Sequence, residues 1–249
     1  MTAHGAPWVE FHMKWVKRAA SDWSIFFLII VFLSTGAYQR NSIWNNEMEL
    51  WKDCVKKSPQ KERAHHNLGF VYYELGQWDD AEREFEESLR LNPRYALSMY
   101  NLGLAFYRKE LIDKAIDYYK KAIRLNSEFP YSFYNLGIAY YQRGLHREAI
   151  DAYHKFLEAK PDYENAHNSL GLAYKALKRR DKAIQSFQEE LRYHPENGYA
   201  HVHLGDIYRE MREYPKALSH FKEALNDPNL YDAERIRKTI SSMETFPRR

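Results

Sequence analysis

The sequence is short of the features that mark several classes of protein. Its 249 residues include one cysteine, Cys54, so no disulfide can form within the chain, and the cysteine content does not identify a redox compartment. The 37 basic and 34 acidic residues give a net charge of only +3, without the clustered positive charge that nucleic-acid binding requires. We therefore expect no nucleic-acid partner. With 45% hydrophobic and 29% charged residues, the composition is globular rather than disordered.

Motifs of catalysis and metal binding are also missing. The sequence contains no GxGxxG, phosphate-loop, HExxH or GxSxG pattern. Its 11 histidines include no pair, with each other or with cysteine, at the i, i+4 spacing that places two metal ligands on one face of a helix. We expect no enzymatic activity, no catalytic residue, no metal site and no cofactor.

What the sequence does have is a repeat and an excess of aromatic residues. It contains 20 Tyr, 13 Phe and 6 Trp. The tripeptide Asn67-Leu68-Gly69 recurs every 34 residues without insertion, as Asn101-Leu102-Gly103, Asn135-Leu136-Gly137, Ser169-Leu170-Gly171 and His203-Leu204-Gly205. With Glu62 as position 1, the five copies are 62–95, 96–129, 130–163, 164–197 and 198–231. A fixed period in this range indicates a solenoid of stacked units.

The residues that the copies share predict a pair of packed helices in each copy. Position 8 is always glycine, position 20 is always alanine, and positions 11 and 24 are always aromatic. Positions 4, 7, 8 and 11 lie on one face of a first helix, and positions 20, 24 and 27 on one face of a second. Glycine inside a helix costs up to about 1 kcal/mol relative to alanine, so its repeated use indicates that two helices approach closely there. Gly76 and Gly144, at position 15, are suited to the turn between the helices.

This pattern resembles the tetratricopeptide repeat. The resemblance covers about two thirds of the chain and implies an all-α, right-handed superhelical solenoid of about five helix-turn-helix repeats. Residues 41–61 are expected to form a degenerate half-repeat, with a helix from Asn45 to Lys57. Residues 232–249 are expected to form a capping helix, because the last repeat would otherwise expose its apolar face.

An apolar segment precedes the repeats. Residues 19–40 follow a short N-terminal segment, 1–18, that has the pattern of an interfacial helix, and they are long enough for one helix to cross a bilayer. We expect a single transmembrane anchor. Basic residues weigh weakly toward its N-terminal side, which places the repeats outside the cytoplasm, in the periplasm if the source is bacterial. Two alternatives stay open: a cleaved signal peptide with a site at Thr35-Gly36-Ala37, and a buried helix of a soluble protein.

The junction between this segment and the repeats has a second resemblance. Arg40-Asn41-Ser42-Ile43-Trp44, with Leu50-Trp51 and Ser58-Pro59, is similar to the junction in multi-pass membrane proteins of the transmembrane-and-tetratricopeptide type. In that family a last membrane helix leads into repeats on the non-cytoplasmic side, and the membrane part resembles polyprenol-phosphate-sugar-dependent mannosyltransferases. This sequence has one candidate span, so we expect it to lack that catalytic part. The resemblance implies only an extracytoplasmic array.

In tetratricopeptide solenoids the first helices line a concave groove, and the resemblance implies that positions 2, 5, 6, 9, 12 and 13 face it. The expected protein-binding residues are His66, Asn67, Phe70, Tyr73, Tyr100, Asn101, Tyr107, Arg108, Tyr131, Tyr134, Asn135, Tyr141, Asn168 and Lys175. Asparagine at position 6 of copies one to three is similar to the asparagine ladder of the O-linked N-acetylglucosamine transferase solenoid, since amides both donate to and accept from a peptide backbone. Tyrosines offer rigid amphipathic contacts of the kind found at binding hot spots. The alternatives are that the asparagines bond within the stack and that the tyrosines pack between neighbouring first helices.

The expected function is therefore that of a membrane-anchored scaffold or adaptor that binds a protein or an extended peptide and assembles a complex. An accessory subunit of a membrane enzyme, such as a glycosyltransferase, is one alternative, and self-assembly into a homo-oligomer is another. The carboxylate clamp that binds chaperone tails is not expected, because only Asn101 matches its residue pattern.

Overall fold

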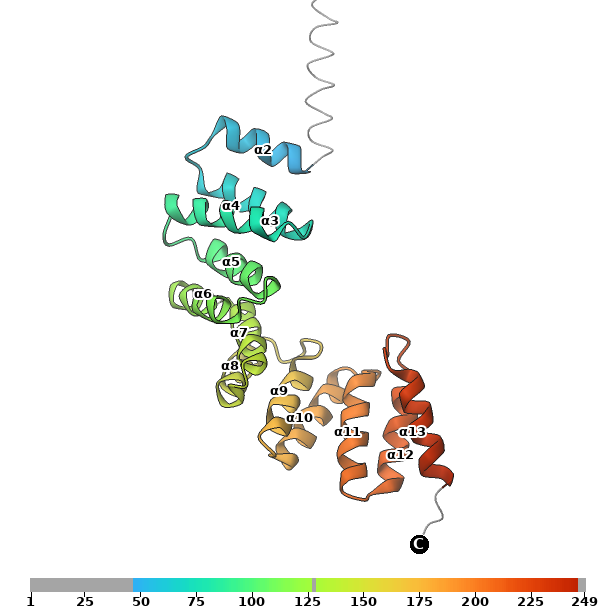
Figure 1. The fold of residues 1–249 in the computed structure, drawn as a ribbon. Helices are drawn as coiled ribbons and strands as arrows, with labels where there is room; N and C mark the ends of the chain where they lie inside the picture. Colours follow the sequence, from blue (N-terminus) through green and yellow to red (C-terminus); the bar gives the residue numbers. More distant parts are fainter. Residues whose placement is uncertain (1–46, 127–128, 246–249) are drawn as a thin grey trace, which may run out of the picture.

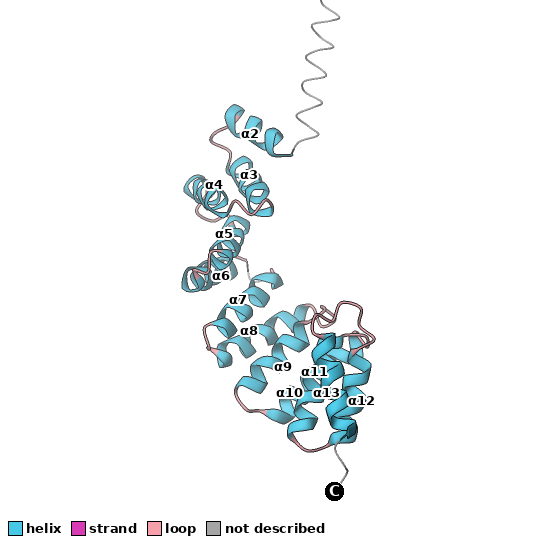
Figure 2. Cartoon of the chain, turned by 45° about the vertical axis from the view of Figure 1, so that its right-hand side comes forward, coloured by secondary structure: helices cyan, strands magenta, loops and turns pink. Residues whose placement is uncertain are grey.

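The computed structural model describes residues 47–126 and 129–245. These residues form twelve α-helices and no strand, joined by short loops (Figures 1 and 2). The helices are α2 (Glu47–Lys57), α3 (Glu62–Glu74), α4 (Trp78–Leu91), α5 (Ala96–Arg108), α6 (Ile112–Leu125), α7 (Pro130–Gln142), α8 (His146–Ala159), α9 (Ala166–Ala176), α10 (Arg180–Tyr193), α11 (Gly198–Glu210), α12 (Tyr214–Ala224) and α13 (Ala233–Thr245). The predicted all-α fold is confirmed for this part of the chain.

Two of the N-terminal predictions lie outside the described residues, namely the interfacial segment 1–18 and the transmembrane anchor 19–40. Within the described ranges, no helix is long and apolar enough to cross a membrane. The half-repeat predicted for 41–61 is described from Glu47 onward, where α2 packs against α3. The array of described helices therefore begins with α2.

The helices pack in chain order. α3 pairs with α4, α5 with α6, α7 with α8, α9 with α10 and α11 with α12, and each second helix also packs against the first helix of the next pair. α13 packs against α12 at the C-terminal end. The first helices α3, α5, α7 and α9 also contact one another in succession. Figure 1 shows the stack descending from α2 to α8 and bending toward α9–α13, with α3, α5 and α7 on the inner side of the bend.

Close approach within each pair explains the glycine at position 8. A Cβ atom added to Gly137 on α7 would lie 2.6 Å from Cε1 of Tyr153 on α8, closer than van der Waals contact allows. The other copies repeat this contact between position 8 and the ring at position 24, with Gly69, Gly103, Gly171 and Gly205 facing Phe85, Tyr119, Phe187 and Phe221. The alanine at position 20 is fully buried in all five copies. The predicted close contact is confirmed, and its partner is an aromatic ring of the same copy.

The turn inside each pair uses one left-handed residue, at position 15. Its φ angle is 73° at Gly76 and 76° at Gly144, and it is 61°, 58° and 63° at Glu110, Lys178 and Arg212. Glycine adopts this conformation without the steric cost that other L residues carry. Two copies therefore have the residue best suited to the turn, and three copies hold a strained one.

The first helix of the fourth copy begins later than the others. α9 starts at Ala166 and follows Asn165, which is left-handed with a φ of 65°. The fully buried carboxylate of Glu190 on α10 accepts hydrogen bonds from the backbone N–H groups of Asn165, at 2.7 Å, and Asn168, at 3.1 Å. The side-chain amide of Asn197 also donates to Glu190, at 3.2 Å. Because a carboxylate is favourable at a helix N-terminus, Glu190 fixes the point where α9 begins.

Candidate functional site

Most of the predicted binding residues lie on one surface of the first helices, which we call the first-helix face. Its members lie at the repeat positions expected to face a partner, on α3, α5, α7 and α9. The exposed or partly exposed members are Asn67, Phe70, Tyr73, Tyr100, Tyr107, Arg108, Tyr131, Tyr134, Asn135, Tyr141 and Lys175. Because consecutive first helices are in contact, these side chains form a surface that continues from one repeat to the next.

Side-chain hydrogen bonds join consecutive first helices across this face. Arg108 Nε on α5 donates to the hydroxyl of Tyr73 on α3 at 3.1 Å. Asn135 Nδ2 on α7 donates to the hydroxyl of Tyr100 on α5 at 2.8 Å. These tyrosines therefore pack between neighbouring first helices, as the alternative interpretation held, while their side chains stay partly exposed. These four side chains are therefore held in place by contacts within the array.

Burial raises the pKa of tyrosine hydroxyls on this face. It raises the pKa of Tyr100 to about 12, with smaller contributions from Tyr73 and Tyr163, and the hydrogen bond from Asn135 acts in the opposite direction. Burial also raises the pKa of Tyr134. At neutral pH these hydroxyls are protonated, so each is able to donate and to accept a hydrogen bond.

Three predicted groove residues are buried, and the structure corrects the predicted site at these positions. His66, Asn101 and Asn168 are each 8% exposed. His66 Nδ1 lies 2.9 Å from Ser98 Oγ, its ring contacts that of Tyr95, and burial lowers its pKa to about 4. Positions 5 and 6 lie where the next repeat packs. The next repeat covers His66, Asn168 and Asn101, whereas the longer tyrosines at position 5 and the asparagines Asn67 and Asn135 at position 6 stay partly exposed.

The predicted asparagine ladder is consequently not continuous. Asn101 is buried, and Asn67 is partly buried. The amide nitrogen of Asn135 donates both to Tyr100 and, at 3.2 Å, to the backbone oxygen of Tyr131. The alternative interpretation, in which the amides bond within the stack, therefore describes Asn135 in this structure.

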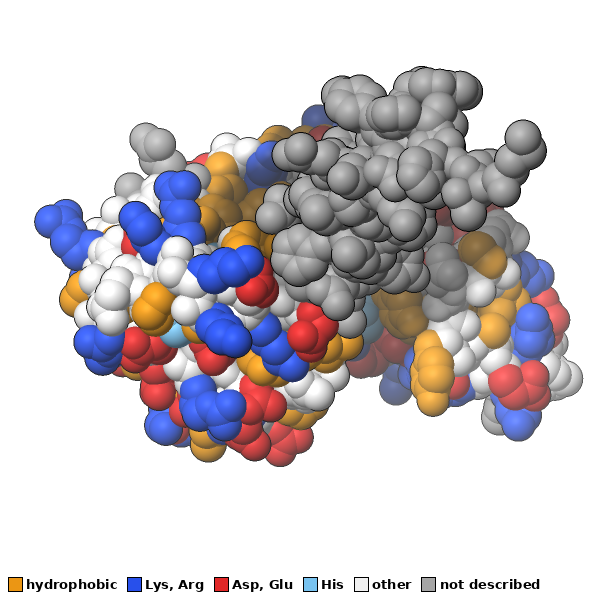
Figure 3. Space-filling view, turned by 90° about the horizontal axis from the view of Figure 1, so that it is seen from above, with side chains coloured by type: hydrophobic (Ala, Val, Ile, Leu, Met, Phe, Trp, Pro, Cys, Tyr) orange, Lys and Arg blue, Asp and Glu red, His pale blue; other side chains and the backbone are white. Residues whose placement is uncertain are grey.

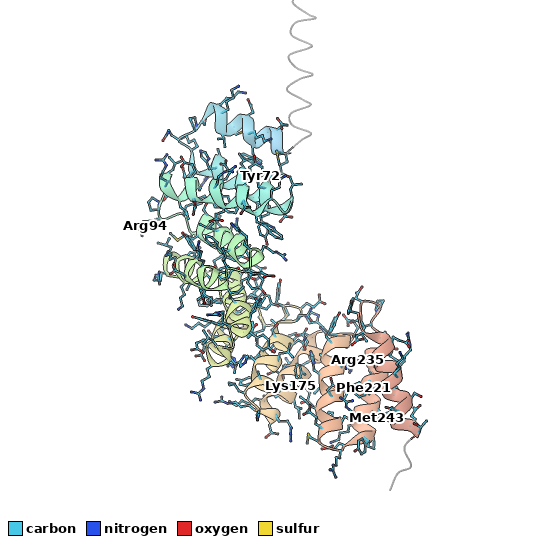
Figure 4. The ribbon with its side chains drawn as sticks, in the orientation of Figure 1. Tyr72, Arg94, Lys175, Phe221, Arg235 and Met243 are labelled. Atoms are coloured by element: carbon cyan, nitrogen blue, oxygen red, sulfur yellow. The ribbon has the colours of Figure 1, made fainter. Side chains whose placement is uncertain are left out.

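Cations lie at the C-terminal end of the first-helix face, on α9, and beyond the face on α13. Lys175 on α9 and Arg235 on α13, both labelled in Figure 4, lie close enough to His203 on α11 to lower its pKa. Burial is the larger cause, the carboxylate of Asp206 acts in the opposite direction, and the resulting pKa is about 4. The imidazole is therefore neutral at physiological pH, so the positive charge near it belongs to Lys175 and to Arg235, which is itself paired with Asp232.

A hollow beside α7, between the third and fourth copies, was not predicted from the sequence. Tyr131 and Tyr134 line it from α7, Tyr163 lines it from the α8–α9 loop, and its volume is about 610 Å³. The other lining residues are Lys160, Asp162, Glu164, Asn165 and His194. One sequence signal pointed to it, because position 34 is aromatic in four of the five copies, as Tyr95, Phe129, Tyr163 and Tyr231.

The face seen in Figure 3 has no patch of one charge sign, and the described residues hold no cluster of metal ligands. Figure 3 shows Lys and Arg side chains interspersed with Asp and Glu on the visible face. Within residues 47–126 and 129–245 there is no group of three His, Cys, Asp or Glu suited to a metal ion. The first-helix face presents tyrosine rings, amides and a few charges.

Comparison with solved structures places the fold among known helical repeat proteins. YrrB, described as a TPR protein with an unusual peptide-binding site, is 20% identical with a TM-score of 0.66, over 77% of this chain and 99% of its own. MamA is 26% identical with a TM-score of 0.62, over 69% of this chain and 97% of its own. PilF of Pseudomonas aeruginosa is 20% identical with a TM-score of 0.60, over 73% of this chain and 88% of its own.

Comparison with protein families gives the same assignment. No curated protein matches the sequence. Two family models, each described as a tetratricopeptide repeat, match residues 67–132 and 134–191 in one case and 165–227 in the other. Together they cover more than half of the chain, and they include the glycine of position 8 in every copy. The protein belongs to the tetratricopeptide repeat family.

Proposed function

We propose that this protein is a scaffold that binds an extended segment of another protein along the first-helix face. The observation that carries the proposal is a row of partly exposed tyrosines, including Tyr73, Tyr100 and Tyr134, whose hydroxyls bond to the neighbouring first helix. Rigid aromatic side chains lose little conformational entropy on binding, and they offer apolar area together with a polar edge. YrrB, a fold neighbour, is described as having a peptide-binding site, which supports the same class of function.

The scaffold is further proposed to be tethered to a membrane by residues 19–40, with the repeats on the non-cytoplasmic side. The apolar length of this segment and the weak excess of basic residues before it support the tether and its orientation. Since α2 begins at Glu47, the tether would hold the N-terminal end of the array close to the bilayer. A reporter enzyme that works only outside the cytoplasm, fused after Arg249, should be active. A fusion active only in the cytoplasm would contradict this orientation.

Binding along the first-helix face is tested by capture with the full chain in detergent, followed by cross-linking and mass spectrometry. Phe70 is 41% exposed, and Arg108 is also exposed on this face. Replacing both with alanine should weaken capture of each partner about tenfold, the loss typical of one or two hot-spot residues. Glu86→Ala, an exposed position on α4, is the matched control and should leave capture unchanged.

Equal capture by the double variant and the control would contradict the use of this face. The identity of the captured protein separates the alternatives. A multi-pass enzyme would make this chain an accessory subunit, and a second copy of this chain would make it a self-assembling structural protein.

A further inference from the structure

The hollow between the third and fourth copies has three tyrosine rings among its lining residues. The rings of Tyr131 and Tyr163 have centroids 5.9 Å apart and planes at 73°, and those of Tyr134 and Tyr163 are 5.3 Å apart with planes at 64°. The fully buried ring of Phe156 lies behind them, 4.9 Å from Tyr134 and 5.1 Å from Tyr163. Three tyrosines therefore border one hollow on a fixed apolar support. Tyr163 is 36% exposed, so a ligand from solvent is able to reach its ring.

Charge in the hollow favours a cation. Asp162 and Glu164 are exposed carboxylates that line it, against one ammonium group, that of Lys160. His194 Nε2 lies 2.9 Å from the backbone oxygen of Asp162, so the histidine donates to the loop and anchors it. The hollow thus combines three tyrosine rings with two carboxylates, and aromatic rings and carboxylates both attract a positively charged side chain.

The combination of rings is particular to the third copy. Tyrosine occupies positions 2, 5 and 34 together only there, as Tyr131, Tyr134 and Tyr163. In the fourth copy all three positions hold asparagine, as Asn165, Asn168 and Asn197. A surface that served only to stack repeats would not need three tyrosines at one junction.

Elsewhere this chain already places cations over its own rings. Lys120 Nζ lies 5.6 Å from the ring centroid of Tyr140, and Lys155 Nζ lies 5.5 Å from that of Phe133. In the described part of the chain, no lysine or arginine lies over Tyr131, Tyr134 or Tyr163 in this way, so their ring faces are not used internally for a cation.

We propose that this hollow is an aromatic cage that receives the positively charged side chain, lysine or arginine, of a peptide lying along the first-helix face. The proposal rests on the proposed function, because the cage binds one side chain of the peptide that the first-helix face is proposed to bind. Two of its walls, Tyr131 and Tyr134, belong to that face, and the loop from Lys160 to Asn165 adds the third wall and the carboxylates. The cage specifies charge at one position of the partner, and the rest of the face supplies apolar and amide contacts.

Two synthetic nonapeptide pools test the cage. They carry arginine or its neutral isostere citrulline at the central position and the same uncharged residues elsewhere. The full chain is immobilised in detergent, and the retained peptide is measured by mass spectrometry. The arginine pool should be retained about fivefold to thirtyfold better than the citrulline pool, as one desolvated cation–π site predicts. Tyr163→Ala and the double change Asp162→Asn with Glu164→Gln should each abolish this preference, whereas Tyr163→Phe should keep it.

Tyr199→Ala is the matched control. Tyr199 is 38% exposed and occupies position 2 in the fifth copy, where position 5 is valine. It should keep the arginine preference, and unchanged helical circular dichroism in every variant excludes misfolding as the cause of a loss. Equal retention of both pools overturns the cage and leaves the proposed function standing. Retention of neither pool overturns both, and a preference that survives Tyr163→Ala overturns the cage.

Discussion

Two tyrosines at the same repeat position differ in one hydrogen bond. Tyr119 and Tyr153 both occupy position 24, where the ring covers a glycine, and both are buried. Burial raises the pKa of each hydroxyl. The hydroxyl of Tyr153 bonds with Ser169 on the next first helix, whereas no described residue bonds that of Tyr119. Both copies therefore need an aromatic ring at position 24 to cover the glycine, but only the third copy uses the tyrosine hydroxyl for a hydrogen bond.

Phenylalanine at these two positions should have opposite effects. Tyr119→Phe removes a buried hydroxyl without a protein partner, so the free energy of unfolding should stay equal or rise by about 1 kcal/mol. Tyr153→Phe leaves Ser169 without that contact and should cost about 1 kcal/mol. Urea unfolding of the full chain measures both changes. Equal losses for the two variants would contradict the assigned difference.

Burial of His66 should make the protein sensitive to mild acid. Its pKa falls from 6.5 to about 4 in the folded protein because of desolvation. Below pH 6.5 the unfolded chain then binds more protons than the folded one, so stability is complete above about pH 6.5 and is lost as the pH falls toward 4. This histidine alone should remove about 2 kcal/mol between pH 7 and pH 5. His66→Phe keeps an aromatic ring and should reduce the loss by that amount in urea unfolding at the two pH values. An unaltered pH dependence would show that His66 does not titrate as described.

At the scale of the element, the turn inside each pair is built on one left-handed residue. Glycine fills it in the first and third copies, and Lys178 fills it in the fourth. A Cβ at Gly76 or Gly144 would meet nothing within 4 Å, so the preference for glycine there is conformational rather than steric. The turns thus share one left-handed backbone conformation, which strains the backbone where the residue is not glycine.

Lys178→Gly should stabilise the protein. Glycine avoids the cost of the left-handed conformation, about 1–2 kcal/mol, but loses more entropy on folding, so the net gain should be about 0.5–1 kcal/mol. Lys178→Ala keeps the backbone strain and removes the same side chain, and it should give no gain. Thermal unfolding of the full chain compares the two. A higher unfolding temperature for both variants would show that the effect comes from loss of the lysine side chain rather than from relief of backbone strain.

The sequence predicts the repeat and the contacts within each copy, but it does not predict which polar side chains the next repeat buries. The 34-residue period and the constant glycine and alanine follow from helix packing that every copy must satisfy, so they are visible without coordinates. The burial of His66 and Asn101 depends on how far the next repeat covers positions 5 and 6, which no single copy encodes. The hollow at Tyr163 escaped prediction for a related reason, because its lining combines a first helix and a loop of the third copy with residues of the fourth.

On the scale of the whole molecule, the array is nearly one-dimensional. Each helix packs almost entirely against its neighbours in chain order, so stability is expected to be a sum of repeat and junction contributions. Figure 1 shows the bend between α7–α8 and α9–α10, and the buried Glu190 network lies at the N-terminus of α9, beside this bend. We call α2–α8 the N-terminal arm and α9–α13 the C-terminal arm. A change that disturbs the junction between them should therefore alter the stability of the two arms unequally.

Glu190→Ala should loosen the C-terminal arm alone. The change leaves the backbone N–H groups of Asn165 and Asn168 without their buried acceptor, at a cost of about 1–3 kcal/mol for each unsatisfied group. In hydrogen exchange of the full chain, α9 to α11 should exchange faster while α3 to α6 keep their protection, since a solenoid transmits stability through neighbouring contacts. Glu189→Ala, which removes a carboxylate that pairs with exposed Arg192 at 3.1 Å, is the control and should change neither arm. Equal loss of protection in both arms would mean that the solenoid unfolds as one cooperative unit, and that Glu190 stabilises the whole array rather than the start of α9.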